Sequence, residues 1–254
     1  MSKIDHTDLL PSTDLPDDEP GFGRGRAGSY EYEATGHRAV DISAYPGRLI
    51  CVEGTDGAGR STQIALLREE LENRGHGVVH TGLTRGGLAG SGLRQAKEGH
   101  TLGRLTTDLF YATDFADRLQ TSVLPALRAG FVVFTDRYVY STIARSVVRG
   151  TDRAWIESVY RFAPKPHETF YLDVSVEQLV RRVLSRGGFD YWESGMDCQP
   201  EGDIYGSFMA YQGRLLKVYR EMAEQSGMTI VDANGETSDT YEALRAGVLR
   251  VVEG

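Results

Sequence analysis

The sequence of 254 residues contains only two cysteines, Cys51 and Cys198, and no long apolar run. A membrane-spanning helix needs about 20 consecutive apolar residues, so we expect no membrane partner. Two cysteines cannot build a disulfide framework, and Cys51 lies in an apolar stretch. We therefore expect a buried thiol and a reducing, cytoplasmic compartment. The first residues also lack a basic segment followed by an apolar one, which predicts no secretory signal.

An excess of positive charge is also missing, because the formal net charge is −8. A protein that binds nucleic acid in general presents a basic surface, so we expect no nucleic-acid partner. A local basic pocket for a phosphorylated small molecule stays compatible with this charge. The six histidines show no metal-ligand spacing, and the single metal ion that we expect is Mg²⁺ arriving with a nucleotide.

Residues 1–46 differ in composition from the rest of the chain. The stretch "DLLPSTDLPDDEPGFGRGRAGS" is rich in Asp, Pro and Gly and has neither helical nor strand periodicity. Such a segment buries too little apolar surface to offset the entropy of ordering it. We therefore predict a flexible, acidic N-terminal extension over 1–46 and a single folded domain over 47–254.

From Arg48 onward, short apolar runs alternate with helical patterns. The runs predicted as strands are "RLICVEG", "GVVHTG", "GFVVFTDRY", "ETFYLDVS" and "MTIVDA". The patterns predicted as helices include "STQIALLREELENRG", "VEQLVRRVLSRG", "FMAYQGRLLKVYREMAEQ" and "TYEALRAGVLRVVEG". Residues 105–128 also have a helical pattern, with Pro125 as a predicted kink or break. This alternation predicts an α/β fold: a parallel sheet of about five strands covered by helices on both faces.

A phosphate-binding loop is predicted where the first strand meets the first helix. The stretch "GTDGAGRST" has the glycines and paired hydroxyls of the G-x-x-x-x-G-K-[ST] pattern. Glycines let backbone N–H groups converge on phosphate oxygens, and the Ser61 hydroxyl is the expected Mg²⁺ ligand. The candidate ATP-binding residues of this loop are Gly54, Thr55, Asp56, Gly57, Ala58, Gly59, Arg60, Ser61 and Thr62.

Arg60 stands where this pattern normally has lysine. Lysine acts as a compact point charge on the outer phosphates, whereas arginine is longer, planar and forked. If the substitution weakens stabilisation of the transition state by about 1.4 kcal/mol, phosphoryl transfer slows about tenfold. We expect slower chemistry, and nucleotide binding without transfer stays open as an alternative.

Together these features resemble the thymidylate kinase family of P-loop nucleoside monophosphate kinases over residues 48–252. The resemblance rests on "ICVEGTDGAGRSTQ", "VVFTDRYVYSTIA", "APKPHETFYLDVSVEQLVRRVLSRG" and "IVDANG". It implies a three-layer P-loop NTPase fold with a lid at about 186–206. It also implies direct in-line phosphoryl transfer from ATP to dTMP with Mg²⁺, and a homodimer.

The resemblance also implies roles for individual residues. Asp56 corresponds to the loop carboxylate that faces the acceptor sugar, and Asp136 to the strand-end carboxylate that serves Mg²⁺. Arg137 corresponds to the arginine that grips the acceptor phosphate, and Tyr111 lies near the position of the ring that stacks on thymine. Ala233 and Asn234 resemble part of the loop beside the donor adenine.

The sequence departs from the family at three places. Residues 82–86 read "GLTRG" instead of Arg-Glu-Pro-Gly-Gly, and Phe115 replaces an arginine that helps to hold the acceptor phosphate. Arg118 or Arg94 is the candidate that compensates for this loss. The lid stretch "GGFDYWESGMDCQPEGDIYGSF" has no lysine or arginine, which leaves Arg186, just before it, as the candidate catalytic arginine.

Three interpretations follow from these observations. The sequence favours a dTMP kinase in which Arg60, Asp136, Arg137 and Arg186 carry catalysis. The changes at 82–86 and Phe115 leave open a kinase with a different phosphorylated acceptor. Arg60 and the acidic lid leave open a catalytically degenerate, nucleotide-binding regulatory or scaffold protein.

Overall fold

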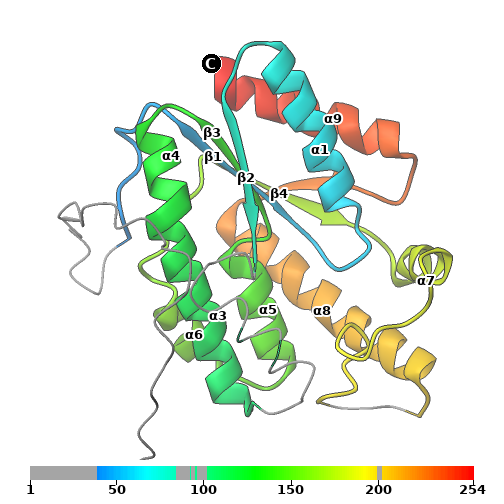
Figure 1. Ribbon diagram of the computed structural model, residues 1–254. Coiled ribbons are helices and arrows are strands. Elements are labelled where there is room, and N and C mark those ends of the chain that lie inside the picture. Colours follow the sequence, from blue (N-terminus) through cyan, green and yellow to red (C-terminus); the bar gives the residue numbers. More distant parts are fainter. Residues whose placement is uncertain (1–38, 84–91, 93–94, 96–101, 199–201) are drawn as a thin grey trace, which may run out of the picture. The chain divides into compact units, whose positions relative to one another are not determined.

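The computed structural model describes residues 39–83, 92, 95, 102–198 and 202–254 (Figure 1). The described residues form a five-stranded, all-parallel sheet in the order β2-β3-β1-β4-β5, as the sequence predicts. Its strands are β1 (Arg48–Glu53), β2 (Val78–Gly82), β3 (Val132–Asp136), β4 (Glu168–Asp173) and β5 (Thr229–Asp232). Most of residues 1–46, the predicted extension, lie outside the described part of the chain.

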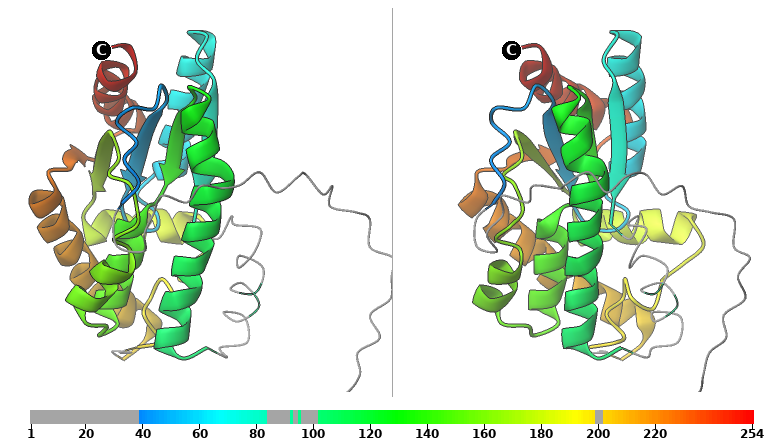
Figure 2. Two further views of the ribbon diagram at one scale, coloured as in Figure 1. Left: turned by 90° about the vertical axis from the view of Figure 1, so that its left-hand side faces the viewer. Right: turned by 60° about the vertical axis from the view of Figure 1, so that its left-hand side comes forward.

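Helices cover both faces of the sheet, which makes the predicted three-layer α/β fold. They are α1 (Arg60–Asn73), α3 (Arg104–Arg118), α4 (Leu124–Arg128), α5 (Val139–Val148), α6 (Arg153–Val159), α7 (Val176–Ser185), α8 (Ile204–Ser226) and α9 (Thr237–Glu253). The views in Figure 2 bring α3 and α4 in front of the sheet, with α1 and α9 behind it. Parallel sheets are normally covered on both faces in this way, because each strand returns through a crossover helix.

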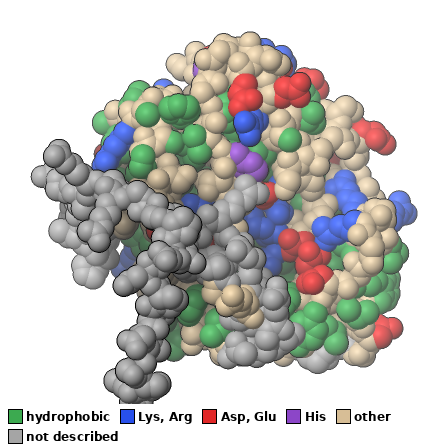
Figure 3. All heavy atoms as spheres, in the orientation of Figure 1, with side chains coloured by type: hydrophobic (Ala, Val, Ile, Leu, Met, Phe, Trp, Pro, Cys, Tyr) green, Lys and Arg blue, Asp and Glu red, His purple; other side chains and the backbone are tan. Residues whose placement is uncertain are grey.

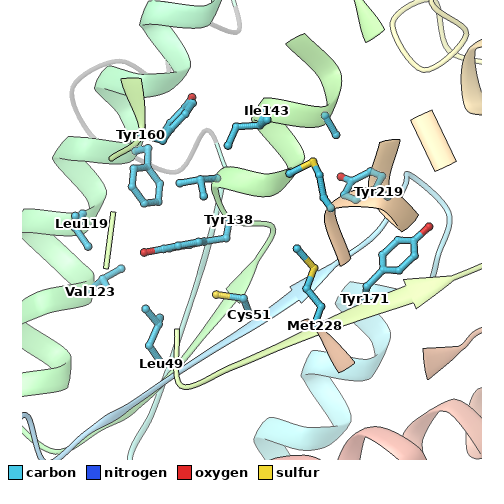
Figure 4. Close-up of a cluster of buried hydrophobic side chains, with 14 of the residues drawn as sticks. Leu49, Cys51, Leu119, Val123, Tyr138, Ile143, Tyr160, Tyr171, Tyr219 and Met228 are labelled. Carbon is cyan, nitrogen blue, oxygen red and sulfur yellow. The ribbon is translucent and has the colours of Figure 1, made fainter. Parts of the chain in front are cut away.

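The strands are apolar on both faces because each face packs against its own cluster of buried side chains. Leu49 and Cys51 of β1 belong to one cluster, with residues of α3, α4, α5 and α8 (Figure 4). Ile50 and Val52 point the other way and pack with residues of α1, α7 and α9. Cys51 is fully buried, as expected, and burial raises the pKa of its thiol.

The helical segment predicted over 105–128 is continuous but changes its winding ahead of Pro125. A π-helical turn, Leu119–Val123, joins α3 to α4, and the Leu124 N–H bonds the Leu119 carbonyl five residues earlier. Proline has no N–H and its ring clashes with the carbonyl four residues before it. The π-helical turn is wider than an α-helical turn and so avoids both the missing hydrogen bond and the clash. Pro125 therefore lies in the first turn of α4 rather than at a break.

Two features of the structure were not predicted from the sequence. Ile42, which belongs to the predicted extension, is 4% exposed and packs in the cluster around Cys51. Helices α5 and α6 were not predicted, because α5 is rich in β-branched residues and α6 has only seven residues, too few to show a helical period. Among the described residues, no helix is long and apolar enough to cross a membrane.

Candidate active site

The glycine-rich loop lies at the carboxyl edge of the sheet, between β1 and α1. Its backbone needs glycine at three points, since Gly54, Gly57 and Gly59 adopt φ values of 146°, 85° and 98°. L-residues with side chains rarely adopt this left-handed region. Gly59 directly precedes α1, so the loop residues and the N-terminal end of this helix face the same space. The predicted phosphate-binding conformation is therefore supported by the backbone itself.

The Arg60 side chain turns inward and is 8% exposed. Its Nε donates to Asp136 Oδ1 at 2.7 Å, and its Nη1 donates to the carbonyls of Gly54 (2.6 Å) and Thr55. Ser61 Oγ donates to the other oxygen of Asp136 at 2.6 Å. Burial opposes both charges, but the attraction between them raises the pKa of Arg60 and lowers that of Asp136. The structure thus brings Arg60, Ser61 and Asp136 together, as the sequence predicts.

Arg137 follows Asp136 in a strained backbone conformation. Its φ is 73°, which is rare for a residue with a side chain. Glu53, fully buried at the end of β1, stabilises this turn by accepting from the backbone N–H groups of Tyr138 (2.7 Å) and Ser141 (3.3 Å). Burial raises the pKa of the Glu53 carboxyl. The turn aims the Arg137 guanidinium back at the glycine-rich loop.

Asp56 of the loop is held between two arginines. Arg137 Nη2 donates to one of its carboxylate oxygens, and Arg145 Nη2 from α5 donates to the other. Burial opposes ionisation of Asp56, but these two guanidinium groups outweigh it and keep its pKa well below the usual range. The Asp56 carboxylate is therefore a fixed negative charge at the boundary of the loop and the neighbouring cavity.

A cavity of about 650 Å³ opens beside the loop, and arginines and aspartates from several elements line it. The arginines are Arg60, Arg104, Arg137, Arg145 and Arg149. The aspartates are Asp56, Asp108, Asp136 and Asp197. Figure 3 shows basic side chains gathered near the centre of one face, beside a group of carboxylates. The size of the cavity and its mixture of charged and aromatic groups suit a phosphorylated small molecule.

Aromatic rings line other parts of the same cavity. Tyr111 of α3 lines this cavity, and Tyr191 and Trp192 come from the segment after α7. Asp108, one helical turn before Tyr111, is buried and accepts from Ser146 Oγ (2.5 Å) and Thr151 Oγ1 (2.8 Å). Aromatic rings and charged groups therefore come from the same elements, α3 and the segment after α7.

The segment after α7 is held at the cavity by Arg149, the residue that directly follows α5. Arg149 Nε and Nη2 form a two-pronged bond to the Asp197 carboxylate, at 2.7 and 3.0 Å. Nη2 also donates to the Trp192 carbonyl at 3.2 Å. This predicted lid, 186–206, is described except for residues 199–201, and its described part lines the large cavity through Tyr191, Trp192, Asp197 and Cys198.

A second, smaller cavity of about 130 Å³ lies on the other side of the loop, between Gly57–Gln63 and the start of α9. Arg182 of α7 lines it and donates to the carbonyls of Gly57 (3.1 Å) and Ala233 (2.6 Å). Asn234 accepts from the Ser175 N–H at 2.8 Å. The predicted residues Thr62, Ala233 and Asn234 thus lie at or beside this second cavity.

Several predicted residues do not join the site. Phe115 is buried in the core, edge-on to Tyr138, and Arg118 lies beneath it with its guanidinium carbon 5.3 Å from the ring centre. Arg118 is not among the cavity-lining residues, so it does not replace the missing acceptor arginine. Arg186 pairs with Glu193 of the lid and does not line either cavity. Arg94 lies outside the described residues.

Sequence reasoning missed Glu53, Arg145, Arg149 and Arg182. Arg145 and Arg149 are four residues apart, which places them on one face of α5. This spacing is a signal only once a helix is recognised after "TDRY". Glu53 and Arg182 leave no local signal, because their partners lie in other elements.

The comparisons with known proteins agree with this geometry. The family model for thymidylate kinase matches residues 52–243. The "Probable thymidylate kinase 2" of Saccharolobus solfataricus is 36% identical over 201 residues, which cover 78% of this chain and 94% of the relative. The "Probable thymidylate kinase" of Thermococcus onnurineus is 35% identical over 207 residues, which cover 78% of this chain and 95% of the relative. The "Probable thymidylate kinase" of Thermococcus kodakarensis is 38% identical over 146 residues, which cover 54% of this chain and 71% of the relative. Because the family model covers most of the chain and two of these relatives match it over nearly their whole length, this chain belongs to the thymidylate kinase family of nucleoside monophosphate kinases.

Proposed function

We propose that the protein phosphorylates dTMP to dTDP with ATP by direct in-line transfer. The observation that carries this proposal is the position of Asp56, which lies in the phosphate-binding loop and also lines the large cavity. A donor held by the loop and an acceptor held in the cavity would therefore meet at one point. No covalent enzyme intermediate is required, because positioning and electrostatics contribute most of the acceleration in phosphoryl transfer.

In this proposal, each of the two cavities binds one of the two substrates. The smaller cavity beside Gly235 and Arg182 suits the nucleoside of ATP, whose phosphates then extend along the glycine-rich loop. The larger cavity suits the acceptor, with Tyr111 beside its base and Arg137 beside its phosphate. A guanidinium binds phosphate through two parallel hydrogen bonds, which fixes both distance and direction. Thymine as the acceptor base rests on the names of the relatives.

The residues at the loop fit a magnesium ion. Ser61 Oγ and the Asp136 carboxylate lie 2.6 Å apart and offer the oxygen ligands that Mg²⁺ prefers. Within the described residues, no group of three or more His, Cys, Asp and Glu side chains could hold a metal ion. Two protein groups suffice here, because Mg²⁺ keeps several waters and takes further ligands from phosphates. Bound with ATP, it would neutralise charge on the phosphate oxygens.

The second candidate is a nucleotide-binding protein that does not transfer phosphate. The engagement of Arg60 with Asp136 and two loop carbonyls favours it, because those contacts compete with phosphate for the guanidinium. A scaffold of this kind would bind ATP and would yield no product. Measured turnover distinguishes it from the kinase.

The test is a coupled ADP-release assay with ATP, Mg²⁺ and a panel of nucleoside monophosphates. Wild type is compared with Arg137→Ala and with Arg153→Ala, an arginine on the exposed side of α6 that pairs with Glu157. Turnover that is highest with dTMP, lost in Arg137→Ala and kept in Arg153→Ala, supports the proposal. Turnover that is highest with another monophosphate would identify that nucleotide as the acceptor instead of dTMP. ATP binding without turnover on any acceptor favours the scaffold.

We also infer from the family that the protein forms a homodimer in the cytoplasm. Light scattering coupled to gel filtration tests the dimer, with a mass near twice the 28.0 kDa of one chain expected. A mass of one chain would contradict it.

A further inference from the structure

The contacts of Asp56 leave a surplus of positive charge in the large cavity. Arg60 pairs with Asp136, and Arg149 pairs with Asp197, so each of these arginines has its own carboxylate. Asp56 instead serves both Arg137 and Arg145. One negative charge between two positive charges leaves a net positive charge at this point of the wall, which attracts an anion.

Arg145 is better placed than Arg137 to offer hydrogen bonds to that anion. Both terminal nitrogens of Arg137 are engaged, Nη2 by Asp56 and Nη1 by Ser141 Oγ at 3.3 Å, and its side chain is 9% exposed. The Arg145 side chain is 18% exposed. Among the described residues, its Nε is buried and has no hydrogen-bond partner. Arg145 therefore has unused donor capacity beside the same carboxylate.

We propose that Arg145 is a second phosphate-binding residue for the acceptor, held in place by Asp56 until the acceptor phosphate arrives. Residues 187–208 contain no lysine or arginine, so α5, rather than the lid, supplies this second cation. The inference rests on the proposed function, because it assigns a ligand within the acceptor cavity. It does not depend on the base, since every nucleoside monophosphate carries the same phosphate.

The test compares the binding of a monophosphate with that of its own nucleoside by calorimetry. The ligands are dTMP and thymidine, and a panel of other monophosphates with their nucleosides. The variants are Arg145→Gln, which removes the charge, and Arg145→Lys, which keeps the charge but loses the fork. Arg153→Gln is the matched control. For Arg145→Gln we expect dTMP affinity to fall about 10- to 100-fold, while thymidine affinity changes less than about twofold. Arg145→Lys should lie between it and wild type.

The other outcomes overturn the inference in recognisable ways. If dTMP and thymidine lose affinity together, Arg145 has a structural role; if neither loses affinity, it does not bind the phosphate. Circular dichroism checks the fold of each variant. Should Arg145→Gln fail to fold, Arg145→Lys decides, and unchanged dTMP affinity in it rejects the role. A wild type that binds none of the monophosphates rejects the proposed function as well, whereas a wild type that binds them with Arg145→Gln unaffected rejects this inference alone.

Discussion

Arg60 Nε donates to Asp136 Oδ1 at 2.7 Å, and this bond joins the first residue of α1 to the last residue of β3. The two side chains are 8% and 10% exposed, so the pair is buried. The position that usually provides a phosphate-binding lysine thus also bridges the loop and the neighbouring strand. Its substitution should affect both stability and rate.

Removing the Arg60 side chain should destabilise the fold. Arg60→Ala leaves the Asp136 charge with the Ser61 hydroxyl alone, and breaking a buried ion pair in this way typically costs about 3–5 kcal/mol. The free energy of unfolding, measured in urea, tests this. Arg68→Ala is the matched control on the same helix, because its pair with Glu72 is about half exposed and should cost less than about 1 kcal/mol. Equal losses in the two variants would contradict the bridging role.

Arg60→Lys should speed phosphoryl transfer about tenfold, which corresponds to about 1.4 kcal/mol. Arg60 reaches Asp136 through Nε and the two loop carbonyls through Nη1, whereas lysine has one nitrogen and no fork, so we expect it to keep fewer of these contacts and to move more readily to the outer phosphates. Single-turnover kinetics with saturating ATP and dTMP measure the step directly. An unchanged or lower rate would show that Arg60 does not limit the chemistry.

Stability should fall in acid through Asp56. Its pKa is depressed in the folded protein, so its contribution is fully present above the unfolded pKa of about 4 and is lost as the pH falls toward the folded pKa. The unfolding free energy of wild type should therefore decline more steeply below pH 4 than that of Asp56→Asn. The raised pKa of Glu53 has the opposite effect on the pH dependence of stability, but Glu53 is present in both proteins. Parallel declines in the two proteins would mean that the two arginines do not stabilise the carboxylate.

Acceptor binding should change the fluorescence of Trp192. The protein has two tryptophans, and Trp192 lines the large cavity whereas Trp155 lies on α6. In a Trp155→Phe background, dTMP should shift the emission, and in a Trp192→Phe background it should not. The reverse pattern would place the acceptor away from the lid.

Arg149 and Asp197 should be energetically coupled in acceptor binding. Their two-pronged bond holds the lid against α5, and charge-assisted bonds of this geometry contribute about 1.5–3 kcal/mol. Arg149→Met should raise KM for the acceptor about tenfold or more, with less effect on KM for ATP. A double-mutant cycle with Asp197→Asn measures the coupling, and additive effects would show that the bond does not act on the lid.

The order of the five strands along the chain and the glycine-rich pattern of the loop could be predicted from the sequence alone. The five apolar runs, the glycines of "GTDGAGRST" and the carboxylate and arginine of "TDRY" are local patterns, and each predicts its element without knowledge of any distant residue. The resemblance to the thymidylate kinase family implied that Ser61 and Asp136 serve the same Mg²⁺ ion. In the structure, β1 pairs with β3, so the loop and Asp136 lie at the same carboxyl edge of the sheet.

Tertiary structure alone decided which arginines belong to the site. The sequence made Arg118 a candidate for the acceptor phosphate and Arg186 the candidate catalytic arginine before the lid, yet Arg118 lies against Phe115 in the core and Arg186 pairs with Glu193. Arg145 reaches Asp56 across 89 positions of the chain. The partners of a long arginine side chain depend on which carboxylates the fold brings within reach. A local sequence pattern does not show which distant residues those are.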